Sequence, residues 1–134
     1  MEDHEVLVID TYGKTRRVSF IGSLKSLLAV IIGKHAEAVG NSENDAFTAY
    51  CSLPMHVLEK NMIGERVLAL LGVHTESFSA EDLYGNIVIA GPNKAGLSSR
   101  QLSALEWLAT YANAGGPGDH IEEDSGQWHD ILWG

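Results

Sequence analysis

Apolar residues in the first third of the chain are grouped at the spacings of strands and of one helix. The unbroken run 6–9 predicts a strand that is buried on both faces. The alternation of polar and apolar residues over 17–20 predicts a second strand, and the turn-forming residues between the two runs predict a hairpin. Residues 24–32 follow Ser23, a residue type that caps helix N-termini, and are apolar at nearly every position. This pattern predicts a core helix packed on a sheet.

The middle of the chain predicts shorter elements separated by turns. Residues 36–39 and 46–51 read as two short strands joined by a polar connection rich in turn formers. The pattern is lost over 53–63, which predicts a loop. Leucine and valine cover one side of 65–71, which predicts a two-turn helix ended by glycine. Residues 86–90 predict a further strand, stopped by the Gly-Pro pair that follows it.

The last helix carries the clearest start signal. Ser98 and Gln101 have the spacing of a capping box, and apolar residues recur behind them at helical intervals, at Leu102, Leu105, Leu108, Ala109 and Ala112. Together these elements predict one α+β domain over 1–113, with a mostly antiparallel sheet of four or five strands and two main helices packed on it. Residues 114–134 are predicted to be a glycine linker and an acidic-aromatic tail, flexible or docked on the domain.

Composition narrows the classes of partner. Of the 134 residues, 45% are apolar and 20% charged, which is typical of a soluble globular domain. A net charge of -9 argues against direct binding to nucleic acid or to anionic lipid, where basic residues supply the affinity. The longest apolar stretch is too short to span a bilayer, and the acidic N-terminus lacks the basic region of a signal peptide. We therefore expect a cytosolic protein.

Candidate catalytic chemistry is weak. The single cysteine, Cys51, excludes an intrachain disulfide and a cysteine-based zinc site. Cys51 ends an alternating strand, so a buried core residue is favoured over a nucleophile activated by one of the histidines at 35, 56 and 74. The six histidines lack the spacing of a zinc motif. We expect no catalytic residue, no metal and no cofactor.

The segment 91–96 lies between a predicted strand and a predicted helix, where phosphate-binding loops occur. It lacks both the Walker spacing and the dinucleotide fingerprint, so a structural connection is favoured over an anion site at Lys94. A small ligand held beside this segment and the loop around His56 remains an alternative function.

The C-terminal tail suggests protein binding. Residues 119–134 hold five acids and no Lys or Arg, and they end in an apolar cluster. Aromatic residues amid acids are typical of segments that fold onto a partner. The predicted anchors for a partner are Trp128, Ile131, Leu132 and Trp133, and the predicted steering acids are Asp119, Glu122, Glu123 and Asp124. The alternative is that the tail docks on its own domain and covers a sheet edge or an apolar patch.

Several segments also resemble a family of small bacteriophage proteins of unknown function, common in phages of actinobacteria. The matching segments are 6–9, 22–27, 37–39, 49–51 and 84–92. The resemblance covers 6–113 and implies an α+β domain, encoded by a phage or prophage and expressed in the host cytoplasm. It implies a host-takeover or defence-evasion role and carries over no catalytic residue. The chain departs from the family pattern at 53–64 and after Asn113.

The leading prediction is a non-enzymatic phage accessory protein that binds a cytosolic host protein. A DNA mimic, whose carboxylates occupy a DNA-binding protein, is the first alternative, and a small-ligand-binding protein is the second. Eighteen acids in 134 residues make a sparse imitation of DNA charge. A homodimer that pairs through an edge strand stays open under each of these readings.

Overall fold

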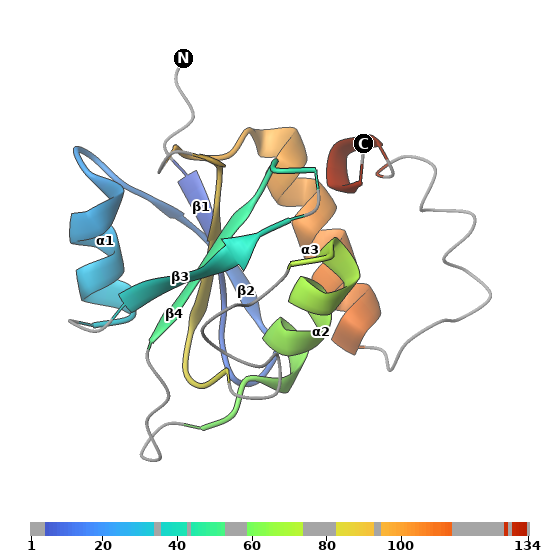
Figure 1. Ribbon diagram of the computed structural model, residues 1–134, viewed down its shortest axis with the longest axis horizontal. Coiled ribbons are helices and arrows are strands. Elements are labelled where there is room, and N and C mark those ends of the chain that lie inside the picture. The colour runs from blue at the N-terminus through green and yellow to red at the C-terminus, as the bar shows by residue number, and fades with distance from the viewer. Residues whose placement is uncertain are drawn as a thin grey trace.

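In the part of the chain that the structure describes, five antiparallel strands form one central sheet. The computed structural model describes residues 5–33, 36–42, 44–52, 59–73, 83–92, 95–113, 128 and 130–133. The strand order is β2-β1-β5-β4-β3, with every neighbouring pair antiparallel. The strands are β1 (Glu5–Ile9), β2 (Thr15–Ser19), β3 (Ala36–Asn41), β4 (Thr48–Ser52) and β5 (Ile87–Ala90), as Figure 1 shows. The predicted α+β class with an antiparallel sheet is confirmed.

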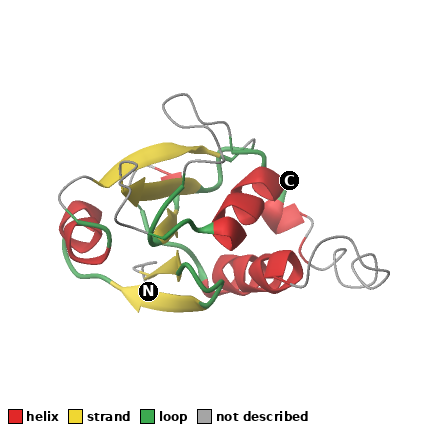
Figure 2. Cartoon of the chain, turned by 90° about the horizontal axis from the view of Figure 1, so that it is seen from below, coloured by secondary structure: helices red, strands yellow, loops and turns green. Residues whose placement is uncertain are grey.

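Helices cover both faces of this sheet. Helices α2 (Met62–Leu71) and α3 (Ser99–Asn113) pack on one face, and α1 (Leu24–Ile31) packs on the other (Figure 2). The central strands β1 and β5 are therefore enclosed from both sides, and residues 6–9 and 87–90 are fully buried. This arrangement confirms the prediction that the apolar run 6–9 is a strand buried on both faces.

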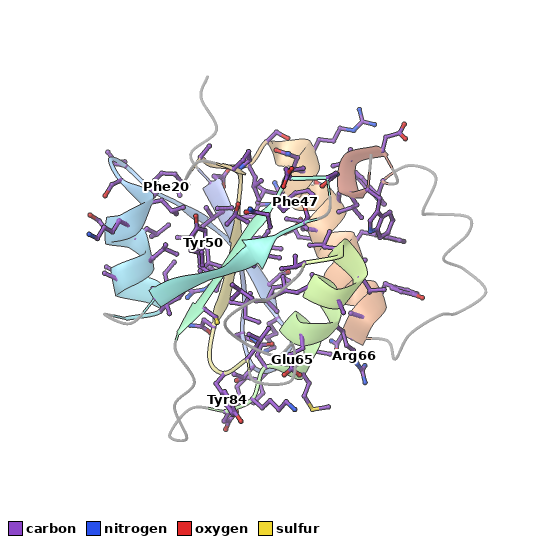
Figure 3. The ribbon with its side chains drawn as sticks, in the orientation of Figure 1. Phe20, Phe47, Tyr50, Glu65, Arg66 and Tyr84 are labelled. Carbon is purple, nitrogen blue, oxygen red and sulfur yellow. The ribbon has the colours of Figure 1, made fainter. Side chains whose placement is uncertain are left out.

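Alternating side chains of the central strands supply two separate cores. Leu7 and Ile89 point into the core under α2 and α3, whereas Val8 and Val88 point into the core under α1. Figure 3 shows Phe20 and Tyr50 on the α1 side and Phe47 on the side of α3, in agreement with the cores to which they belong. The sheet therefore lies between two separate cores, one under α2 and α3 and one under α1. The outer surfaces over these two cores are separate as well.

Helix α1 is less buried than its apolar sequence predicts. Only Leu24 and Leu28 are buried, and Val30 is 83% exposed. Helix α1 packs on the sheet as predicted, but no described element covers its outer side, so its apolar residues do not all enter the core. The predicted cap is confirmed, because the Ser23 hydroxyl accepts a hydrogen bond from the Ser26 amide at 3.3 Å.

Helix boundaries follow local capping. Helix α2 begins at Met62, three residues before the predicted start, because the Asn61 side chain accepts a hydrogen bond from the Gly64 amide and caps the helix. Gly72 ends α2 in a left-handed conformation, as predicted. The capping box of α3 is confirmed by reciprocal hydrogen bonds of 2.9 and 3.1 Å between Ser98 and Gln101. Among the described residues, no helix has the length and apolar character that a membrane crossing requires.

Candidate protein-binding surface

The end of the chain is docked on its own domain. Residues 130–132 are helical, as is Trp128, and the turn that they form lies beside α2 and α3 (Figure 1). We call Trp128 together with residues 130–133 the C-terminal segment. Leu132 is fully buried in the core under α2 and α3. The indole N–H of Trp133 donates to the carbonyl of Leu70 at 2.7 Å, and the Asn44 amide donates to the carbonyl of Leu132 at 3.2 Å.

Docking changes what the predicted anchors can contact. Leu132 was expected to face a partner, but its burial gives it the role of holding the C-terminal segment in place. Trp128, Ile131 and Trp133 pack on the same core and are only partly buried, so each keeps some surface available to another molecule. For the described residues the structure favours the docked alternative. The predicted steering acids Asp119, Glu122, Glu123 and Asp124 lie outside the described residues.

Helix α3 adds two aromatic side chains that the sequence analysis did not single out. Trp107 and Tyr111 lie one turn apart and stack, with ring centroids 6.0 Å apart and planes 7° from parallel. Both are partly buried against the same core as the C-terminal segment. Two aromatic residues four positions apart on a predicted helix lie on the same side of that helix. This spacing is the sequence signal for the Trp107–Tyr111 pair.

These aromatic side chains share one side of the sheet, because all of them pack against the core under α2 and α3. All three tryptophans of the chain are among them, and none of the three is fully buried. Leu70, at the end of α2, is 39% exposed and lies where the Trp133 indole is anchored. We use the name aromatic surface for the set Leu70, Trp107, Tyr111, Trp128, Ile131 and Trp133.

A cavity of about 130 Å³ lies where the C-terminal segment meets the domain, lined by Asn44, Leu71, Leu132 and Trp133. Sites for drug-sized ligands and cofactors measure about 300–1,000 Å³. The cavity is therefore a gap beside a docked segment, large enough for about one side chain.

The other candidates for chemistry contribute little in the described part of the chain. Cys51 is fully buried among apolar residues, which confirms its predicted place in the core. All six histidines lie outside the described residues. Across the described ranges, no group of three or more His, Cys, Asp or Glu side chains is arranged to hold a metal ion.

The connection after β5 is tightly built. The Gly91 amide donates to the carbonyl of Ala95 at 2.9 Å, and a Cβ on Gly91 would lie 2.7 Å from the carbonyl oxygen of Gly96. At the start of α3, the Gln101 amide is already bonded to the Ser98 hydroxyl. These contacts support the structural reading of 91–96, while Lys94 lies outside the described residues.

Comparison of the chain with protein-family models, curated proteins and solved structures finds no match. The resemblance to the phage family therefore stays a prediction.

Proposed function

We propose that the protein is a non-enzymatic binding module that engages another protein through the aromatic surface. The observation that carries this proposal is the placement of all three tryptophans, each partly exposed, on the side of the sheet that carries α2, α3 and the C-terminal segment. Tryptophan and tyrosine dominate the binding energy of many protein interfaces, because they bury a large area with few rotatable bonds.

Docking of the C-terminal segment supports this function. Burial of Leu132 and the hydrogen bond from the Trp133 indole to Leu70 hold the partly exposed aromatic side chains in place before a partner arrives. A surface ordered in advance loses less conformational entropy on binding than a free tail. The acids at 119–124 would steer the protein towards a basic partner. The phage origin, the host partner and the role in host takeover rest on the resemblance alone.

Two alternatives have less support. The described cavity is small for a metabolite, which weighs against a ligand-binding protein. A DNA mimic needs a continuous negative surface, whereas the α1 side exposes Arg16 and Lys25, neither of which forms an ion pair with a described residue. Neither alternative gives the aromatic surface a binding role.

Capture from a host lysate tests the proposal. Full-length wild-type protein and a Trp107→Ala/Trp128→Ala variant serve as baits, and Tyr12→Ala, which truncates a 73% exposed aromatic residue in the β1–β2 turn, is the matched control. We expect one protein to be retained by the wild type and by Tyr12→Ala, and to fall by about tenfold or more with the tryptophan variant.

Salt separates this mechanism from DNA mimicry. Capture that persists between about 50 and 500 mM salt fits apolar anchors, and capture that is lost over this range fits a mimic of phosphate charge. Equal capture by all three baits, or capture by none of them, would contradict the aromatic surface as the binding site.

A further inference from the structure

The charge of the chain is divided unevenly between two regions. Residues 11–36 contain five of the nine Lys and Arg residues and none of the 18 acids. The other 108 residues hold four basic against 18 acidic residues. This basic region comprises the β1–β2 turn, β2 and α1, so it belongs to the edge of the sheet and to the α1 layer.

The same region exposes large apolar side chains. Ile21, just before α1, is 99% exposed, and Val30, near its end, is 83% exposed. They are the two most exposed of the large apolar residues that the structure describes. Three half-buried apolar residues of the same helix region extend the apolar area, namely Leu27, Ile31 and Ile32. Single exposed apolar residues are ordinary on protein surfaces, but a group of them on one helix is typical of interaction sites.

Two cations that form no ion pair with a described residue lie in the same α1 layer as these apolar residues. Arg16 pairs in register with Val8, whose side chain packs beneath α1, so Arg16 projects on the α1 side of the sheet. Lys25 is exposed on α1 itself. Neither forms an ion pair with a described residue, in contrast to Arg17, whose guanidinium contacts Glu106 on the other side. We call Arg16, Ile21, Lys25 and Val30 the basic–apolar surface.

We propose that the basic–apolar surface is a second docking site, which binds a segment of a partner protein that carries both acidic and apolar side chains. Charge complementarity points to the acidic residues, and the exposed Ile21 and Val30 point to the apolar ones. This site lies across the sheet from the aromatic surface and does not depend on the function proposed for it.

The charge of the rest of the chain favours a short protein segment over an extended polyanion. At physiological salt, charges more than about 8 Å apart are largely screened, so a short segment experiences mainly the local cations. A nucleic acid or an anionic membrane extends beyond these cations and also meets the rest of the chain, which holds 18 acidic against four basic residues. Two cations without an ion pair to a described residue and an eight-residue helix are also a small binding area for either of those partners.

Selection from a random 12-residue peptide library displayed on yeast tests this proposal, with the full-length protein as the labelled bait. Two variants change the site. Arg16→Glu/Lys25→Glu reverses its two positive charges, and Ile21→Ser/Val30→Ser replaces its two exposed apolar side chains. Arg100→Glu, an exposed charge reversal on α3, is the matched charge control. Trp107→Ala reports on the aromatic surface, so that failure of one site is distinguishable from failure of the other.

We expect enrichment of peptides that combine Asp or Glu with large apolar residues. Their affinity should fall by about tenfold with each site variant and by less than about twofold with Arg100→Glu and Trp107→Ala. The proposal is overturned if no peptides are enriched, or if the enriched peptides bind both site variants as they bind the wild type.

Two further measurements test other occupants of the basic–apolar surface, namely a membrane and a second copy of the chain. If vesicles of phosphatidylcholine and phosphatidylglycerol bind the wild type but not Arg16→Glu/Lys25→Glu while no peptide is enriched, the surface serves a membrane. A dimer in sedimentation experiments that is lost in Ile21→Ser/Val30→Ser would make it a contact between two copies. Either result overturns the assignment to an acidic partner segment.

Discussion

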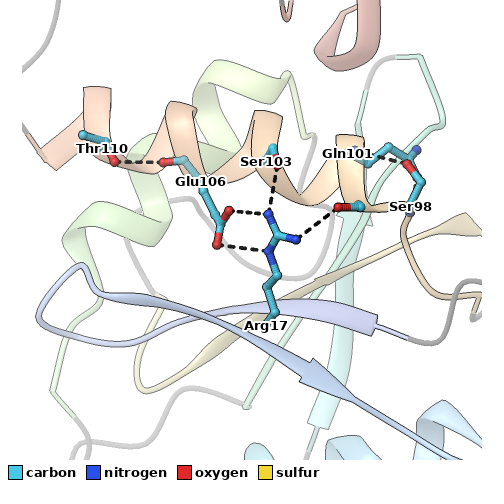
Figure 4. Close-up of polar contacts among 7 residues, drawn as sticks. Arg17, Ser98, Gln101, Ser103, Glu106 and Thr110 are labelled. Carbon is cyan, nitrogen blue, oxygen red and sulfur yellow. Dashed lines mark hydrogen bonds and ion pairs between the residues drawn. The ribbon is translucent and has the colours of Figure 1, made fainter.

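Arg17 on the edge strand β2 and Glu106 on α3 form a two-pronged ion pair that ties the edge of the sheet to the helix above it (Figure 4). The Arg17 Nη2 atom lies 2.7 Å from Glu106 Oε1, and Nε donates to Oε2 at 3.3 Å. The same guanidinium also donates to the hydroxyls of Ser99 and Ser103. The hydrogen bond to Glu106 raises the pKa of Arg17 and outweighs the opposing effect of burial. This pair holds β2, whose other edge pairs with no described strand, against the α2–α3 side of the sheet.

Removal of the Arg17 side chain should destabilise the fold modestly. We expect Arg17→Ala to lower the free energy of unfolding by about 1 kcal/mol, because the pair is about one-third exposed and its geometry is bidentate. The loss should shrink at high salt. Arg16→Ala, next to it on the same strand and without an ion pair among the described residues, is the control and should change stability by less than about 0.5 kcal/mol. Urea denaturation measures both, and equal losses would contradict the role of the pair.

Asn61 is a stronger point of attachment, and its replacement should cost more. Its side chain is fully buried, accepts from the Gly64 amide at 2.8 Å, and donates to the carbonyls of Ile9 and Gly85 at 2.9 and 2.8 Å. Asn61→Ala removes the cap of α2 and the side-chain donor that bonds the buried carbonyl of Ile9 and the partly buried carbonyl of Gly85. We expect a loss of about 3 kcal/mol in unfolding free energy.

A second cap provides the comparison for Asn61. Ser23→Ala removes an exposed cap of α1 that makes no contact with a carbonyl of the sheet, and should cost about 1 kcal/mol. Similar losses in the two variants would show that the buried bonds of Asn61 add nothing to its capping role.

Leu132→Ala tests whether the C-terminal segment is docked in solution. Because Leu132 is fully buried, the variant should lose about 2 kcal/mol of stability, near the lower limit for a buried leucine since the segment can undock instead of leaving a cavity. Digestion by a protease within 114–127 should also release the segment more readily from the variant. Ile21→Ala, at a 99% exposed position, should change neither result. A variant as stable as the wild type would mean that the segment is not held by this contact.

Local sequence signals predict where the helices and strands lie better than they predict which of their side chains are buried. The capping box of Ser98 and Gln101 and the apolar run 6–9 are recognisable because they depend on neighbouring residues. The apolar pattern predicts a start for α2 three residues too late, because it does not include the cap residue Asn61. The exposure of Val30 could not be predicted, since an apolar helix face does not reveal whether another layer covers it.

At the candidate site, too, the position of the segment could be predicted from the sequence, whereas the burial of its individual side chains could not. The sequence predicts that the apolar end of the chain either binds a partner or docks on its own domain, and the described residues are docked. Which side chain faces inward depends on contacts made across the chain, such as that between Trp133 and Leu70. Trp107 and Tyr111 gain their importance only because the C-terminal segment packs on the same core. The spacing of neighbouring residues along the sequence does not predict such long-range contacts.

Alkaline pH should weaken the α1 layer through Tyr50. Tyr50 is 7% exposed in the core beneath α1, and burial raises the pKa of its phenol. In the unfolded chain a tyrosine ionises near pH 10, whereas in the folded protein Tyr50 keeps its proton to a higher pH. The unfolded state therefore binds fewer protons above about pH 10, and stability falls as the pH rises past that value. Below about pH 9 this contribution should be constant.

Tyr50→Phe should therefore lose less stability than the wild type between about pH 9 and 11, while at pH 8 the two proteins should show the same slope of stability against pH. Urea denaturation at about pH 8, 10 and 11 measures the difference. Tyr12→Phe, which removes a hydroxyl from a 73% exposed residue, is the control and should follow the wild type. If Tyr50→Phe and the wild type lose stability in parallel up to pH 11, Tyr50 is not shielded from solvent, and α1 does not close over the sheet as tightly as its core of Phe20, Leu24 and Leu28 indicates.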